Sequence, residues 1–199
     1  EPGINLAAWV DSVYLPGKKW QGTWDPEGIL STIPAIASGI TGLLVGRFFL
    51  KDKSPSIKAN YLMTLGFLSM VLGYLWGLHF PINKNLWSSS FVLFTSGMAA
   101  LVLGAFYFLV DILGKKKGTS VGIIFGANAI AVYVLADLLS LIFYGLPLGG
   151  QSLNEHFMAA GSGLGLPEEL SSLLYAILFV AVNFIPAYIL YKKKIFIKL

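Results

Sequence analysis

Five long stretches of the chain are dominated by apolar residues, and short polar segments separate them. A helix needs about 20 mainly apolar residues to cross the hydrocarbon core of a bilayer. Membrane β-strands would alternate apolar and polar positions, whereas these stretches are apolar on every face. The pattern predicts an all-α polytopic membrane protein with a bundle of five transmembrane helices. The expected spans are residues 28–50, 57–78, 86–113, 121–145 and 169–191.

Two shorter helices are expected outside the spans. Residues 1–27 are predicted to form an outer segment and residues 28–199 the transmembrane domain. Within the outer segment, NLAAWVDSVY (residues 5–14) combines a capping Asn with an apolar, aromatic face, which is typical of an interfacial helix. In the loop 146–168, Ser152 and Glu155 have the spacing of a capping box and predict a second short helix.

Composition and charge agree with this fold class. Only 12% of the residues are charged, about half the share usual in soluble domains, and the mean hydropathy is +0.73. The loops after the first and third spans and the C-terminal tail hold most of the 14 Lys and Arg residues. By the positive-inside rule the N-terminus lies outside and the C-terminus in the cytoplasm.

The same features limit the partners and the chemistry. The net charge of +4 is explained by loops that face anionic lipid headgroups, so nucleic-acid binding is not expected. The absence of cysteine excludes disulfides and thiolate chemistry. The chain starts with EPGIN, without an initiator Met or a signal-peptide core, which is expected of a fragment.

The stretch WDPEG, residues 24–28, has two interpretations. Asp25 could cap the first span, with Pro26 at the first helical position and Glu27 complementing the positive end of the helix dipole. Alternatively, one carboxylate of Asp25 and Glu27 points into an outward-facing cavity and holds an amine or a hydroxyl. Capping alone explains the motif, and the two readings are compatible because a carboxylate has two oxygens.

Polar residues also gather between the second and third spans, in FPINKNLWSSS (residues 80–90). The structural explanation is a turn with Asn caps and a Trp at the membrane interface. The functional explanation is a polar ligand site built by Asn83, Lys84, Asn85 and the three serines on the same expected outer side as WDPEG.

Two polar residues lie inside the fourth expected span. An intramembrane carboxylate is unfavourable unless it is paired, protonated or facing water, so Asp137 is a candidate for ligand contact. Asn128 could instead bond between helices. His79 and His156 have no other ligand at metal-binding spacing and are read as surface or interfacial histidines, so no metal site is predicted.

Four ordered blocks resemble the C-terminal part of the heparan-alpha-glucosaminide N-acetyltransferase family, whose bacterial relatives include some labelled N-acetylglucosamine-related transporters. The blocks are WDPEGILSTIPAIASGITGLLVG, FPINKNLWSSSFVLFTSG, FGANAIAVYVL and YILYKKKIFIKL. Ala127 departs from the Met often found at its position. The resemblance implies transfer of acetyl from cytoplasmic acetyl-CoA to the amine of a glucosamine-type sugar on the outer side. The family's catalytic His is expected in the N-terminal part, so no catalytic residue is assigned in this chain.

The resemblance also suggests roles for the matching positions. Asp25 and Glu27 would hold the sugar. Asn83, Lys84 and Trp87 would line the outer cavity. Asn128 and Tyr133, with Asp137 deeper in the same span, would face the acyl-donor path. The expected partners are membrane lipid, the N-terminal half of the same protein, the amino-sugar substrate and a second copy of the chain. The expected location is the bacterial inner membrane.

Three functions remain open at this stage. The first is the acetyltransferase, in which case this chain alone is expected to be inactive. The second is an N-acetylglucosamine-related sugar transporter with the same polar outer mouth, which five spans without a visible internal repeat disfavour. The third is a half-bundle that works only by association, suggested by rows of small residues such as Ser38, Gly42 and Gly46.

Overall fold

Two compact units make up the chain in the computed structural model, which describes residues 3–197. The first unit ends at Lys115 and the second begins at Lys116. The expected division between residues 27 and 28 therefore lies inside the first unit. In the described part of the chain there is no strand, only an isolated bridge between Leu148 and Gln151.

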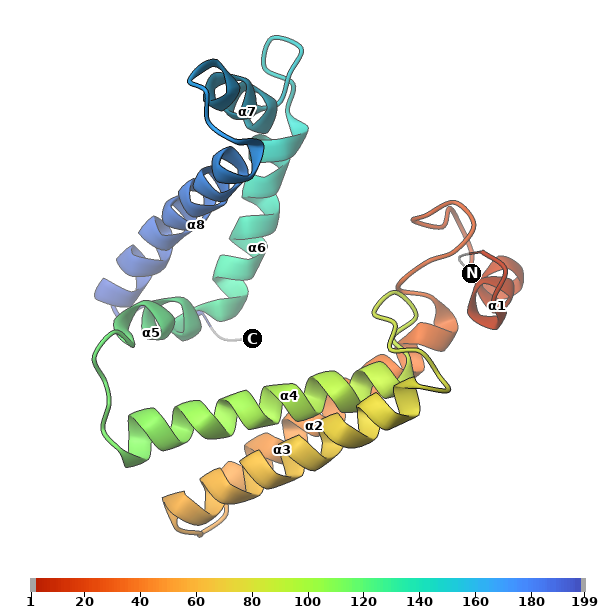
Figure 1. Ribbon diagram of the computed structural model, residues 1–199, viewed down its shortest axis with the longest axis vertical. Helices are drawn as coiled ribbons and strands as arrows, with labels where there is room; N and C mark the ends of the chain where they lie inside the picture. Colours follow the sequence, from red (N-terminus) through yellow and green to blue (C-terminus); the bar gives the residue numbers. More distant parts are fainter. Residues whose placement is uncertain (1–2, 198–199) are drawn as a thin grey trace. The chain divides into compact units, whose positions relative to one another are not determined.

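The elements of each unit are helical (Figure 1). The first unit contains α1 (Leu6–Tyr14), α2 (Ile29–Phe49), α3 (Pro55–Gly77), α4 (Ser89–Tyr107) and the π-helical turn η1 (Phe108–Ile112). The second contains α5 (Ser120–Ala127), α6 (Ala129–Ser140), the π-helical turn η2 (Leu141–Gly145), α7 (Leu153–Gly163) and α8 (Glu168–Lys192).

Four helices are long and apolar enough to cross a membrane within residues 3–197. They are α2, α3, α4 with η1, and α8, and each ends within three residues of its predicted bounds. The prediction of an all-helical protein with several spans is confirmed. A fifth span exists only if α5 and the α6–η2 segment are counted as one bent helix.

The expected continuous span at 121–145 is wrong, because the helix breaks at Asn128. The two parts on either side of the break meet at 84°, and Asn128 itself has a non-helical backbone with φ −134° and ψ 42°. Neither Pro nor Gly occupies this position. The break follows from contacts of the Asn128 side chain with the C-terminal tail, which are described with the site.

Glycines bring α3 and α4 into backbone contact, and the two helices run side by side in Figure 1. A Cβ at Gly66 would lie 2.8 Å from the carbonyl oxygen of Gly97, and a Cβ at Gly97 would meet the backbone nitrogen of Met70. In lipid, such close approach is a main source of helix association. The row of small residues on α2 makes no such backbone contact, because Gly42 and Gly46 face open space.

In the second unit, α8 packs against α5, α6 and α7. The Tyr175 hydroxyl on α8 donates to the carbonyl of Phe143 in η2 at 2.7 Å, and Phe157 of α7 packs on the Tyr175 ring. The predicted capping box is confirmed: Ser152 and Glu155 exchange both bonds at the start of α7. The predicted helix behind Asn5 is confirmed as α1, with the Asn5 carboxamide oxygen accepting from the Ala8 amide at 2.9 Å.

Candidate functional site

Asp25 closes a loop and does not cap α2. Its Oδ2 accepts from the Trp20 amide and its Oδ1 from the Glu27 amide, each at 2.9 Å. These two bonds, that of Trp20 first, lower the pKa of the Asp25 carboxyl. The expected capping role is wrong, because α2 begins at Ile29 with Gly28 as the preceding cap residue. Asp25 is therefore an ionised residue whose oxygens both already accept bonds from the backbone.

The start of α2 is capped instead by a residue of another helix. Asp11 of α1 is 1% exposed, and its Oδ1 accepts from the Ile29 amide at 2.8 Å. The carboxylate lies so close to Gly28 that a Cβ there would overlap it. A negative charge at a helix N-terminus is favoured by the helix dipole. Asp11 thus fixes the segment that carries Asp25 and Glu27 onto α1.

Replacing Asp11 by alanine is expected to lower the free energy of unfolding by about 1–2 kcal/mol, because the Ile29 amide loses its acceptor. Hydrogen exchange at the Ile29 amide should become faster in the same variant. Asp25→Ala is the matched control and should leave that amide protected. Exchange that rises in Asp25→Ala and not in Asp11→Ala would contradict the tertiary cap.

Glu27 and Lys84 are the two candidate site residues of this region whose charged groups remain available. Both side chains are exposed, and within residues 3–197 neither has a hydrogen-bond or ion-pair partner. Figure 1 shows the segment before α2 and the loop between α3 and α4 at the same end of the first unit. This end, called the Trp87 end below, presents a free carboxylate and a free ammonium group.

The serines of the loop between α3 and α4 are used within the loop. The Ser88 hydroxyl donates to the carbonyl of Pro81 at 2.9 Å and accepts from the Asn83 amide at 3.0 Å. The Ser90 hydroxyl donates to the carbonyl of Phe80 at 2.7 Å, and the Asn83 side chain accepts from the Asn85 amide at 2.8 Å. These groups shape the turn, so the set of free polar groups is smaller than the sequence suggests.

Trp87 links this loop to α2. Its indole Nε1 donates to the Ser38 hydroxyl at 3.0 Å, and its ring packs edge-on against Phe91 at 5.2 Å. Its φ of 49° is left-handed, which is rare for a bulky residue and occurs mostly where surrounding structure enforces it, often at functional sites. The backbone strain and the tertiary bond together make Trp87 a positioned residue.

A hollow of about 510 Å³ extends along α2 and α4 from Trp87. Its polar lining residues are Ser38, Thr41, Thr95 and Ser96. Thr41 and Ser96 are hydrogen-bonded at 3.1 Å and connect α2 to α4. The hollow is large enough for a small ligand, and of the residues expected to bind the sugar, Trp87 lines it.

In the second unit, Asn128 is engaged by the C-terminal tail. It is 1% exposed; its Nδ2 donates to the carbonyl of Ile195 at 3.0 Å and its Oδ1 accepts from the Ile197 amide at 2.8 Å. Tyr133 and Asp137 are one turn apart on α6, and both are exposed. In the described residues the Asp137 carboxylate has no partner. The structure therefore separates buried Asn128 from the exposed pair.

The histidines show no arrangement for catalysis or metal binding. His79 is exposed, and His156 lies with Nε2 2.7 Å from the carbonyl oxygen of Leu148. No cluster of three or more His, Asp or Glu side chains that could hold a metal occurs between residues 3 and 197.

Two curated proteins match most of the chain. The heparan-alpha-glucosaminide N-acetyltransferase of Mus musculus is 34% identical over 188 residues, which cover 88% of this chain and 26% of the mouse protein. The enzyme of the same name from Homo sapiens is 33% identical over 188 residues, or 25% of its length. Over this region the chain is similar to the heparan-alpha-glucosaminide N-acetyltransferases of both species.

The expected family resemblance is thereby confirmed, and the apolar helices indicate an integral membrane protein. The chain spans about a quarter of the length of the curated relatives that it matches. No family model matches it.

Two residues that hold parts of the candidate site in place, Asp11 and Ser38, were not identified from the sequence. Asp11 could have been noticed in the sequence, because it is the only charged residue of α1 and the other residues of this helix are uncharged. Ser38 was recognised only as a small residue for helix packing, whereas its hydroxyl accepts from Trp87. Both act between elements distant in sequence, so spacing along the chain could not assign their partners.

Proposed function

We propose that this chain is part of a membrane acetyltransferase that moves acetyl from acetyl-CoA to the amine of a glucosamine-type sugar. The observation that carries the proposal is the match to two enzymes named for this activity over 88% of the chain. Donor and acceptor occupy different compartments in this scheme, which is why the enzyme must span the membrane. The bacterial inner membrane is the proposed location.

The proposed topology places the Trp87 end of the first unit outside and the turn that holds Lys51 in the cytoplasm. The support is the distribution of Lys and Arg among the loops, because positively charged loops remain cytoplasmic. In this orientation five spans are proposed, with α5 and α6–η2 counted as one. The N-terminus is then outside and the C-terminus inside.

For the acceptor, we assign direct contacts to Glu27 and Lys84 and positioning roles to Asp25, Asn83 and Trp87. The Glu27 carboxyl group can accept hydrogen bonds from an ammonium or hydroxyl group. Lys84 can donate to ring or hydroxyl oxygens. Asp25 and Asn83 shape the two loops through backbone bonds, and Trp87 lines the hollow.

For the donor, Tyr133 and Asp137 are the proposed contacts on α6, since both are exposed and the Asp137 carboxylate has no partner within the described chain. Asn128 would act there only through the shape of the α5–α6 break, because its amide is engaged by the tail. The general base is proposed to be a His of the N-terminal half of the same protein. A second copy of the chain is a further candidate partner.

The test incubates the full natural protein in proteoliposomes with acetyl-labelled CoA and glucosamine. Label on the sugar is the expected result. Movement of N-acetylglucosamine across the bilayer without acetylation would overturn the proposal in favour of the transporter. The 199-residue chain by itself is expected to be inactive, and acetyl transfer by it would contradict the assignment of the base to another part of the protein.

The acceptor assignment predicts the effect of Glu27→Gln. Loss of a charged hydrogen bond to the substrate amine should raise KM for glucosamine roughly 10- to 100-fold, with a smaller change in kcat. Glu169→Gln removes the same charge from the start of α8 and serves as the matched control with unchanged KM. An equal effect of both variants would show that Glu27 contributes only general negative charge.

A further inference from the structure

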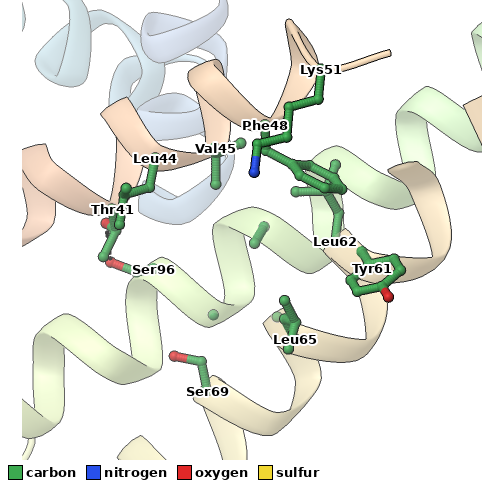
Figure 2. Close-up of a pocket in the computed structure, with 13 residues that line it drawn as sticks. Thr41, Leu44, Val45, Phe48, Lys51, Tyr61, Leu62, Leu65, Ser69 and Ser96 are labelled. Carbon is green, nitrogen blue, oxygen red and sulfur yellow. Dashed lines mark hydrogen bonds between the residues drawn. The ribbon is translucent and has the colours of Figure 1, made fainter. Parts of the chain in front are cut away.

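A second hollow of the first unit lies toward the turn between α2 and α3, where Lys51 stands. It has a volume of about 390 Å³ and is called the Lys51 groove here. Its apolar lining consists mainly of Leu44, Val45, Phe48, Leu62, Leu65 and Ala100. Figure 2 shows the labelled lining side chains between α2, α3 and α4, with the Lys51 side chain directed toward Phe48.

The floor of the Lys51 groove is backbone. Gly66 and Gly97 form the close contact of α3 and α4, and both line the groove. With no side chains at these positions, space remains beneath α2. Only one residue of α2, Ser31, is buried, so this helix leaves the groove open along its side.

The three serine and threonine hydroxyls that line the groove are already hydrogen-bonded within the protein. Ser69 donates to the carbonyl of Leu93 at 2.9 Å, and Thr41 donates to the carbonyl of Ser38 at 2.7 Å. Ser96 pairs with Thr41 at 3.1 Å. A ligand with amides or hydroxyls along its length would find few partners here. An alkyl chain requires none.

The mouth of the groove is cationic. Lys51 lines it, and Lys53 lies with Nζ 5.9 Å from the ring centre of Tyr61, another lining residue. In residues 3–197 no Lys or Arg forms a salt bridge, so the Lys51 and Lys53 ammonium groups are not paired with Asp52. The nearby Lys58 ammonium donates to the carbonyl of Phe49 at 2.7 Å. Two ammonium groups without a salt-bridge partner among the described residues are therefore close to the apolar groove.

We infer that the Lys51 groove is a binding site for an anionic glycerophospholipid. One acyl chain lies in the groove, and the headgroup phosphate lies between Lys51 and Lys53. Basic pockets between transmembrane helices recognise anionic lipid headgroups in this way, and the charge distribution predicts that this end faces the anionic cytoplasmic leaflet. The inference rests on the proposed topology for the choice of leaflet, and it uses none of the residues assigned to the acceptor or the donor.

Native mass spectrometry of the full natural protein, delipidated and then supplied with phosphatidylglycerol or phosphatidylcholine, tests this site. We expect one phosphatidylglycerol to bind in preference to phosphatidylcholine. Lys51→Gln with Lys53→Gln should weaken that binding roughly 30-fold. Lys18→Gln with Lys19→Gln removes the same charge elsewhere and should leave it unchanged. Equal losses in both double variants would overturn the site.

Two further measurements separate the lipid from other occupants. Ala100→Phe fills the groove and should abolish lipid binding while the headgroup lysines remain; thermal unfolding checks that this variant is folded, and Ala100→Leu replaces it if it is not. Retained binding would show that the acyl chain does not enter. Glycerol phosphate or acetyl-CoA that displaces phosphatidylglycerol at equal concentration would identify a soluble phosphate site and overturn the proposal.

Discussion

Gly97→Ala is expected to lower the free energy of unfolding by about 3 kcal/mol or more. The added Cβ would overlap the backbone nitrogen of Met70, and the backbone cannot move aside as a flexible side chain can. The α3 and α4 helices must then separate and lose the close contacts that hold them together in lipid. Unfolding by denaturing detergent, followed by far-ultraviolet circular dichroism, measures the loss.

Gly42→Ala is the matched control for this prediction. It makes the same chemical change within a helix, but no atom lies within 4 Å of the added Cβ. Because alanine favours a helix over glycine by about 1 kcal/mol, stability should stay the same or rise slightly. Equal stability of the Gly97→Ala and Gly42→Ala variants would contradict the backbone contact between α3 and α4.

Asn128→Ala should lower the free energy of unfolding by about 2–3 kcal/mol and release the C-terminal tail. The variant loses both bonds of the side chain and leaves the Ile195 carbonyl and the Ile197 amide without partners. Hydrogen exchange at Ile197 should accelerate. Tryptic cleavage near Lys194 should accelerate with it.

Asn60→Ala is the control, since Asn60 is exposed on α3 and only accepts a local bond from Thr64. It should change neither exchange nor cleavage at the tail. A tail in Asn128→Ala as protected as in the unaltered protein would show that Asn128 is free for a ligand, and the donor role expected from the family resemblance would then regain support.

The membrane spans were predictable because the bilayer interior favours an apolar side chain at every position of a span. The bounds of α2, α3 and α8 follow from the lengths of their apolar stretches. The short helices α1 and α7 were predictable for another reason. Their caps, Asn5 and Ser152, bond to amides three residues away, so the whole interaction is present in the local sequence.

The candidate site was predictable only in part. Residue type and loop position pointed to Glu27 and Lys84 as candidate contacts, and both side chains are exposed. They could not show that the side chains of Asp25 and the loop serines are hydrogen-bonded to backbone groups. The residue type is the same whether or not its side chain is already hydrogen-bonded. The left-handed backbone of Trp87 was likewise invisible before its bond to Ser38 was known.

The sequence by itself determined a helical membrane protein, most of its spans, its resemblance to known acetyltransferases and the residue types at the Trp87 end. The tertiary structure decided which residues act together. Asp11 caps a helix that begins 18 residues later, and Asn128 breaks a predicted span by binding a tail nearly 70 residues away. Apolar length is a local property that each segment carries alone, whereas a hydrogen bond needs a partner that only folding brings within reach.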